Sequence, residues 1–113
     1  MSERLRIISE ALEGKSLKVN AFGKVYDTVF TVDLYHLGYT VAVELVMADD
    51  PENPFCTLTC NIPNITLGDR EILVKTWSEN EEPARCALAS GFFKDTGKRV
   101  STGFVQAQIW EVL

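Results

Sequence analysis

Two runs of alternating apolar and polar residues, separated by an acidic turn, occupy the middle of the chain. The first run extends from Tyr39 to Met47 and the second from Phe55 to Ile62. Alternation with a period of two is typical of strands with one buried face, and two such runs around a short connection predict an antiparallel β-hairpin. The connection, residues 49–54, reads Asp-Asp-Pro-Glu-Asn-Pro and is rich in turn-forming residues. We expect this hairpin to form the framework of the fold.

Further strand patterns occur on both sides of this hairpin, at residues 17–22, 25–37, 71–77 and 104–112. In the first of them Leu17, Val19 and Ala21 share one face. The second places Asp27 and Asp33 on one face, which predicts that this face meets solvent. Its connection to the central hairpin is so short that we expect the two strands to pair antiparallel.

Residues 2–13 have the periodicity of an amphipathic helix. Leu5, Ile8 and Leu12 fall on one stripe, while charged side chains occupy the other faces. Ser2 is placed to cap the first turn, since a hydroxyl can accept a hydrogen bond from a free backbone N–H. We therefore expect an N-terminal helix with one buried face.

Residues 78–90 predict a second helix. Ser78 is the candidate cap, and Glu81 stands at the position that completes a capping box. Pro83 is compatible with a helix only because it lies near the start, where a missing N–H costs little.

Together these elements predict an α+β domain that covers residues 1–113. We expect a mostly antiparallel, wrapped β-sheet of about five to six strands, with the N-terminal helix and the helix near residues 78–90 covering a face. At 113 residues the chain has the length of one ordinary domain. It is long enough to bury one core without disulfides or metals.

The charge balance argues mildly against a nucleic-acid-binding protein. Eleven basic and 16 acidic side chains give a formal charge of −5, whereas binding to phosphates depends on clustered Lys and Arg. The first residues do not resemble a signal peptide, and no apolar run approaches the ~20 residues that span a bilayer. With three cysteines and no export signal, we expect reduced thiols and a cytoplasmic location.

The thiols and the single histidine offer little chemistry. Cys56 and Cys60 share a strand face about 13 Å apart, which is too far for a disulfide. Cys86 lies in the second helix, and the spacings do not match a zinc site. Nothing in the sequence places His36 beside a cysteine for nucleophilic catalysis. Buried core thiols are the favoured interpretation.

Acidic side chains gather in two segments, which are the candidate partner-binding residues: Asp49, Asp50 and Glu52 in the turn, and Glu79, Glu81 and Glu82 at the helix start. Acid–base catalysis needs a carboxyl group in a pocket that shifts its pKa. Carboxylates in turns and at helix starts are normally solvated. We therefore expect no enzyme, no catalytic residue, no cofactor and no metal, and no membrane partner.

One local cluster of basic residues supports an alternative. Lys94, Lys98 and Arg99 follow two phenylalanines, and basic residues beside aromatic ones can bind single-stranded nucleic acid. The glycines at 91 and 97 do not have the spacing of a phosphate-binding loop, and Arg99 stands where that motif has Ser or Thr. A turn at residues 95–97 is the better interpretation of this stretch.

From the central hairpin onward, the chain resembles a family of small uncharacterised proteins, known as a domain of unknown function, from bacteria, phages and conjugative elements. The matching segments are Val41-Ala42-Val43-Glu44-Leu45, Glu52-Asn53-Pro54-Phe55-Cys56-Thr57-Leu58-Thr59-Cys60-Asn61-Ile62, Ile72-Leu73-Val74-Lys75-Thr76 and Ser101-Thr102-Gly103-Phe104-Val105. An additional Asn before the Pro and the Thr between Ser and Gly depart from the family pattern. The resemblance covers residues 39–113, brings no catalytic residues, and implies a mobile-element setting.

These observations lead to one main hypothesis and several alternatives. The main one is a small non-enzymatic phage or mobile-element protein that binds a host protein or ribonucleoprotein, with inhibition of a CRISPR-type defence nuclease as its concrete version. The alternatives are a weak nucleic-acid-binding module and a small-ligand-binding domain with a pocket between helix and sheet. A homodimer is also possible, because apolar side chains on the surface are common in interfaces. The candidates for such exposure are Val29, Val46, Trp77 and Trp110, with the two Trp favoured as core residues.

Overall fold

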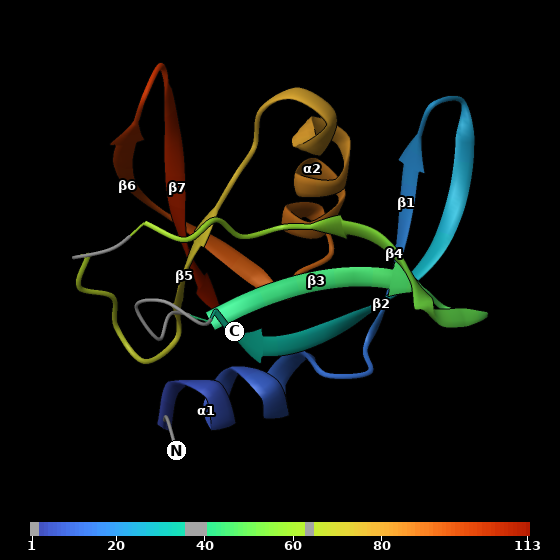
Figure 1. Cartoon of the computed structure of the whole chain (residues 1–113), viewed down its shortest axis with the longest axis horizontal. Coiled ribbons are helices and arrows are strands. Elements are labelled where there is room, and N and C mark those ends of the chain that lie inside the picture. Colours follow the sequence, from blue (N-terminus) through green and yellow to red (C-terminus); the bar gives the residue numbers. More distant parts are fainter. Residues whose placement is uncertain (1–2, 36–40, 63–64) are drawn as a thin grey trace.

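Two antiparallel sheets and two α-helices enclose the main core (Figure 1). The computed structural model describes residues 3–35, 41–62 and 65–113. The elements are α1 (Glu3–Leu12), β1 (Ser16–Ala21), β2 (Lys24–Leu34), β3 (Val41–Met47), β4 (Asp50–Thr57), β5 (Glu71–Val74), the 3-10 turn η1 (Ser78–Asn80), α2 (Glu81–Ala89), β6 (Phe93–Thr102) and β7 (Val105–Val112). One sheet has the strand order β1-β2-β3-β4 and the other β5-β7-β6.

The expected α+β class and the N-terminal helix are confirmed, but the sheet is divided. The described part of the chain has seven strands in two sheets, where one wrapped sheet of five to six was expected. The segment after β4 joins the sheets: the amide of Leu58 donates to Val43 O at 2.9 Å, and the amide of Cys60 donates to Leu73 O at 3.1 Å. Residues 58–60 therefore form hydrogen bonds with both sheets and connect them.

A chain of aromatic side chains holds the two sheets together. The ring of Phe30, which is fully buried on β2, meets the rings of Phe92 and Phe93 edge-on, each at a centroid distance of 5.7 Å. Phe93 in turn contacts the ring of Trp110 on β7 at 5.5 Å. Edge-to-face pairs contribute about 1 kcal/mol beyond the area that they bury. The core thus spans both sheets as one unit.

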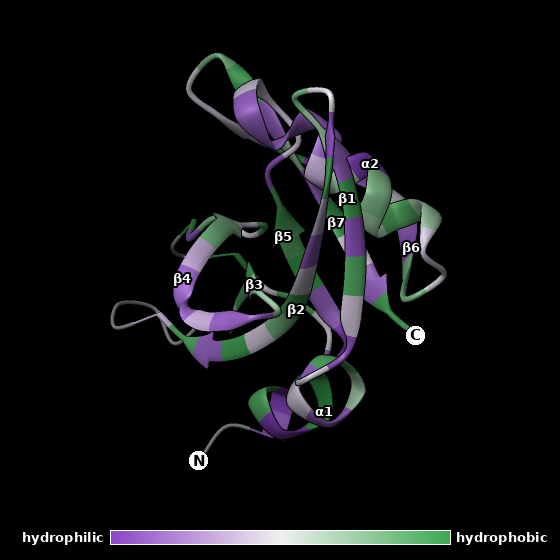
Figure 2. Cartoon of the chain, turned by 90° about the vertical axis from the view of Figure 1, so that its right-hand side faces the viewer, coloured by the Kyte–Doolittle hydropathy of each residue, from purple (hydrophilic) through white to green (hydrophobic). Residues whose placement is uncertain are grey.

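The periodicities of the first two elements predict their buried faces correctly. On α1, Ile8 and Leu12 are buried, whereas Leu5 is half-buried. On β1, every second residue is buried, and the alternation is visible along the ribbon (Figure 2). The α1 helix begins at Glu3 in the described part of the chain, so the predicted cap Ser2 lies outside the described residues.

Strand β3 is buried on both faces, which its alternation does not predict. Ala42 and Val46 are buried although they point away from Val43 and Leu45. Val46 was a candidate for surface exposure, and that expectation is wrong. Trp110 is also buried, as favoured. Central strands with cover on both sides read as continuous apolar runs, and β3 has this character.

The start of the second helix differs from the predicted capping box. Ser78 adopts a left-handed backbone conformation with φ of 54° and begins η1, so its side chain caps nothing. The residue before α2 is Asn80, whose side chain likewise makes no capping bond. Its Nδ2 instead donates to Thr57 O at 2.7 Å, because Asn80 is buried against the end of β4. A tertiary contact has replaced the local one.

The bounds of one strand and the presence of another were also mispredicted. The return strand β4 begins at Asp50, inside the expected turn, and ends at Thr57. Strand β6 was not expected at all. It contains a bulge in which Thr96, Gly97 and Lys98 stand opposite the single residue Ile109, so the turn predicted at residues 95–97 is a local distortion within a strand.

Candidate partner-binding site

An exposed phenylalanine occupies the tip of the β1–β2 hairpin. The two strands pair up to Ala21 and Lys24, and Phe22 and Gly23 form the two-residue turn. Both turn residues have positive φ, 54° for Phe22 and 71° for Gly23, which is the type I′ conformation. The side chain of Phe22 is 78% exposed. An aromatic residue in this conformation is unusual, since the left-handed region favours Gly, Asn and Asp.

A second exposed phenylalanine occupies the tip of the β6–β7 hairpin. The strands pair up to Thr102 and Val105 around the turn residues Gly103 and Phe104. Gly103 has φ of 64°, which suits the first position of a type II′ turn. Phe104 is fully exposed, at 108% of its reference area. Neither turn phenylalanine buries its ring in the core.

The fold brings the two tips to the same end of the molecule. In Figure 1 both hairpin turns point upward, and in Figure 2, turned by 90°, they again lie at the top. The start of α2 lies between them in Figure 1, with the helix packed against β1. Figure 1 shows the two tips on opposite sides of this end. We call this end of the molecule the hairpin end; it includes the turn residues Phe22 and Phe104 and the carboxylates of η1 and the first turn of α2, Glu79, Glu81 and Glu82.

The predicted carboxylates at the helix start are all exposed on the hairpin end. Glu82 forms an ion pair with Arg85 one turn along α2. Glu79 and Glu81 form no ion pair within the residues that the structure describes. Carboxylates in the first turn also interact favourably with the helix dipole, which gives them a local structural role.

The second acidic segment lies elsewhere. Asp49, Asp50 and Glu52 are exposed around the β3–β4 turn. Asp49 lines an open pocket of about 320 Å³ together with Val25 and Tyr26, which lie on β2 shortly after the turn of the β1–β2 hairpin. Val25 is itself 58% exposed. The two acidic segments therefore belong to different elements, one to the β3–β4 turn beside β2 and the other to η1 and the first turn of α2.

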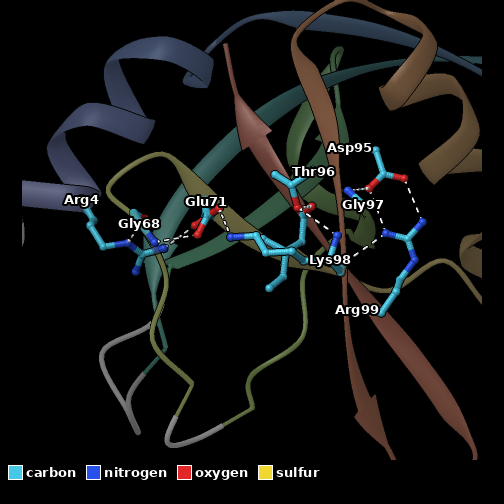
Figure 3. A network of polar contacts seen from close by, with 9 residues as sticks. Arg4, Gly68, Glu71, Asp95, Thr96, Gly97, Lys98 and Arg99 are labelled. Atoms are coloured by element: carbon cyan, nitrogen blue, oxygen red, sulfur yellow. Dashed lines mark hydrogen bonds and ion pairs between the residues drawn. The ribbon is translucent and has the colours of Figure 1, made fainter.

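Two of the three residues in the basic cluster are engaged in ion pairs (Figure 3). Lys98 Nζ lies 2.6 Å from Glu71 Oε2, and the hydrogen bond from Lys98 holds the pKa of Glu71 below its usual range. The guanidinium of Arg99 binds both carboxylate oxygens of Asp95, at 2.9 and 3.0 Å, and lowers the pKa of Asp95. Lys94 is exposed and forms no ion pair within the described chain.

These polar contacts fix the bulge of β6. The hydroxyl of Thr96 donates to Ile109 O at 2.6 Å and accepts from the amide of Lys98 at 3.2 Å, while Gly97 donates to Asp95 Oδ1 at 2.9 Å. Because a bulge bends its strand and increases the twist, this geometry sets the direction of the hairpin that carries Phe104.

The same network reaches the N-terminal helix. Glu71 Oε1 accepts from the amide of Gly68 at 2.8 Å. Arg4 donates from Nε to Gly68 O at 3.0 Å and from its guanidinium to Glu71 O, and its burial lowers the pKa of its guanidinium (Figure 3). The Lys98–Glu71 ion pair is thus part of the contact between α1, β5 and β6, whereas the Arg99–Asp95 pair lies within β6.

Two open pockets lie beside the helices. One of about 230 Å³ lies between α2 and β7, with Glu81, Leu88 and Trp110 among its lining residues. It has the place predicted for a small-ligand site, and a larger depression of about 450 Å³ lies beside α1 and Leu113. Within the described ranges, no group of three or more His, Cys, Asp or Glu side chains is arranged to hold a metal. No helix among the described residues is long and apolar enough to cross a membrane.

All three thiols are free and half-buried, not fully buried as expected. Burial raises the pKa of Cys56 to about 12, with Lys75 opposing the shift and Glu44 adding to it. Burial also raises the pKa of Cys60. The predicted residue His36 lies outside the described residues.

We expect Cys56 to be unreactive in the folded protein. A thiol with a pKa near 12 carries at least about 100-fold less thiolate at pH 8 than an unperturbed one. In a variant that keeps Cys56 and carries Cys60→Ala and Cys86→Ala, iodoacetamide should react at least that much faster in denaturant than in native buffer, measured by mass spectrometry.

The same shift has a defined sign for stability. Folding favours the neutral thiol of Cys56, so its contribution to the free energy of unfolding is complete below the ordinary pKa of 9.0 and is lost as pH rises toward about 12.

Equal alkylation rates in native buffer and in denaturant would contradict the expected protection and would show that the thiol of Cys56 is accessible and has an unshifted pKa.

Sequence reasoning missed Phe22 and Phe104 as site residues. A signal was present, because Phe22-Gly23 follows an alternating strand at the place where Asn-Gly is the preferred pair.

In comparisons with known proteins, no family model matches this sequence, and no curated protein and no solved structure is significantly similar to it. The function must therefore be argued from the chemistry of the hairpin end.

Proposed function

We propose that this chain is a non-enzymatic protein that acts by binding another protein through its hairpin end. The observation that carries the proposal is the pair of exposed phenylalanines, Phe22 and Phe104, at two turn tips on the same end of the molecule. Both rings are exposed on turns, where a partner can reach them. Aromatic residues are also the usual energetic centres of protein interfaces.

Stability does not account for Phe22. Its ring is mostly exposed and gains little from burial, and its backbone occupies a region that is costly for a side chain with a Cβ. Strained residues of this kind cluster at functional sites, where a contact outside the chain compensates for the cost. The position is best explained by a partner that receives the ring.

The proposed setting rests on the resemblance of the sequence motifs to proteins of phages and conjugative elements, since no family model matches the chain. A small protein of that kind, acting in the cytoplasm, has a host protein or ribonucleoprotein as its natural target. We propose a CRISPR-type defence nuclease complex as that target, with this chain acting as an anti-defence protein that blocks it by binding.

The alternative of nucleic-acid binding has less support. Lys98 and Arg99 already neutralise Glu71 and Asp95, so only Lys94 of the basic cluster is without an ion pair among the described residues. Binding to phosphates would have to break those pairs. A homodimer through the hairpin end would bring the three carboxylates of each copy together, and like charges in an interface oppose association.

The test is affinity capture from host lysate with three forms of the tagged protein. The double variant Phe22→Asn/Phe104→Ser removes both rings from the hairpin end. The matched control Leu113→Ser removes an apolar side chain that is 59% exposed beside α1, away from the tips. We expect one stoichiometric protein with the wild type and the control, and its loss with the double variant. Identical captured proteins in all three samples would contradict the proposal.

A further inference from the structure

We propose that the partner surface that receives the hairpin end is a single-stranded nucleic-acid-binding site. This inference rests on the proposed function and names the chemistry of the partner. The hairpin end offers two exposed aromatic rings on its tips and exposed carboxylates at the start of α2, which lies between the two hairpins in Figure 1. A single-stranded nucleic acid offers the same two kinds of group, flat rings and negative charges, to the proteins that bind it.

The two exposed rings are presented on short, closed turns. Phe22 and Phe104 each stand on a two-residue turn, and each turn is closed by paired strands. A side chain held on such a short turn loses little backbone freedom on binding, which favours affinity. Proteins that bind single strands carry apolar and aromatic platforms on which bases stack, and these platforms accept any flat ring.

The exposed carboxylates at the start of α2 favour a basic partner surface. Glu79, Glu81 and Glu82 belong to η1 and the first turn of α2, an element whose start lies between the two hairpins in Figure 1. Among the described residues, Arg85 forms an ion pair with Glu82 and with no other carboxylate. A basic surface is therefore the complementary partner for this face, and the formal charge of −5 favours the encounter from a distance. Grooves that follow a nucleic-acid backbone are basic for the same reason. Rings and carboxylates together fit one class of partner surface better than either does alone.

Hydrogen bonds and an ion pair fix the direction of the second hairpin. Phe104 projects from the hairpin whose bulge is fixed by Thr96, Asp95 and the Lys98–Glu71 ion pair. The first tip belongs to β1, against which α2 packs. Both rings are therefore tied to the framework that also carries the carboxylates, so the three groups are presented together.

The experiment uses photocrosslinking in host lysate. Phe22, Phe104 or the control Leu113 is replaced by p-benzoylphenylalanine, and each protein is irradiated with and without an excess of a mixed-sequence single-stranded oligonucleotide. We expect Phe22 and Phe104 to label the same polypeptide and Leu113 not to label it. The oligonucleotide should reduce both adducts at least tenfold, because it occupies the site that the two rings enter.

The possible failures are distinguishable. Adducts at both tips that persist in excess oligonucleotide, or adducts to two different proteins, would overturn the nucleic-acid-site inference and leave the proposed function standing. No adduct at either tip, from protein shown to be folded, would overturn both.

A charge variant gives a second readout. Replacing Glu79, Glu81 and Glu82 by Gln keeps the size and helix-forming character of each side chain. We expect it to reduce the crosslinking yield about tenfold at low salt and much less at high salt, since salt screens exposed charges. An unchanged yield at low salt would remove the electrostatic half of the inference.

Discussion

Phe22→Asn is expected to stabilise the protein and to weaken partner binding at the same time. Asn followed by Gly is the preferred pair for a type I′ turn, so the variant should gain about 1 kcal/mol in the free energy of unfolding. Loss of an aromatic anchor from an interface typically costs about 2 kcal/mol or more, which is at least roughly 30-fold in affinity. Chemical denaturation and titration against the captured partner measure the two effects.

The opposite signs make this test informative. If Phe22 served the fold, the variant would lose stability and would weaken binding only as a consequence. Leu113→Asn is the control, because it removes an exposed apolar side chain at a site with no turn strain; it should change neither quantity by more than a few tenths of a kcal/mol. Full affinity in a stabilised Phe22→Asn protein would exclude Phe22 from the interface.

Phe30→Ala is expected to have the largest effect on stability, a loss of about 3–5 kcal/mol in the free energy of unfolding. Phe30 is fully buried on β2 and meets Phe92 and Phe93 edge-on. Its removal leaves a cavity where the first sheet contacts the elements that lead into the second. Urea denaturation followed by tryptophan fluorescence reports the change, since Trp110 belongs to the same aromatic chain.

Val25→Ala is the matched control on the same strand. Its side chain is largely exposed, so the substitution should cost less than about 0.5 kcal/mol. We also expect Phe30→Ala to unfold in one transition at a lower denaturant concentration. Two separate transitions, or a loss below about 1 kcal/mol, would mean that the two sheets do not share one cooperative core.

Local periodicity was enough to predict several elements. The alternation from Leu17 to Ala21 and the stripe of Ile8 and Leu12 identify faces that the structure buries. These predictions succeed because each buried face repeats at the period of its own backbone, so the signal is contained in a short window of sequence. The antiparallel arrangement of β2, β3 and β4 follows for the same reason, from alternating runs with short connections.

The missed elements lack that local signal. β6 carries charged residues on its exposed face, and its bulge interrupts the period of two, so the alternation is lost. β4 starts with Pro51 and Pro54 beside acidic residues, which read as a turn. An edge strand tolerates proline because one side of its backbone needs no hydrogen-bond partner. The capping box at Ser78 failed because Asn80 bonds to β4, a contact that no local window contains.

The sequence by itself determined the α+β class, the main buried faces and the presence of two acidic segments, because periodicity and composition are local properties. Only the tertiary structure decided which of these features meet. It brought the β1–β2 turn with Phe22, the start of α2 with its carboxylates, and the β6–β7 turn with Phe104 to one end of the molecule. That juxtaposition depends on α2 packing against β1 and on the bulge that directs the β6–β7 hairpin. Both are long-range packing outcomes, set by how the side chains of remote elements fill a shared core.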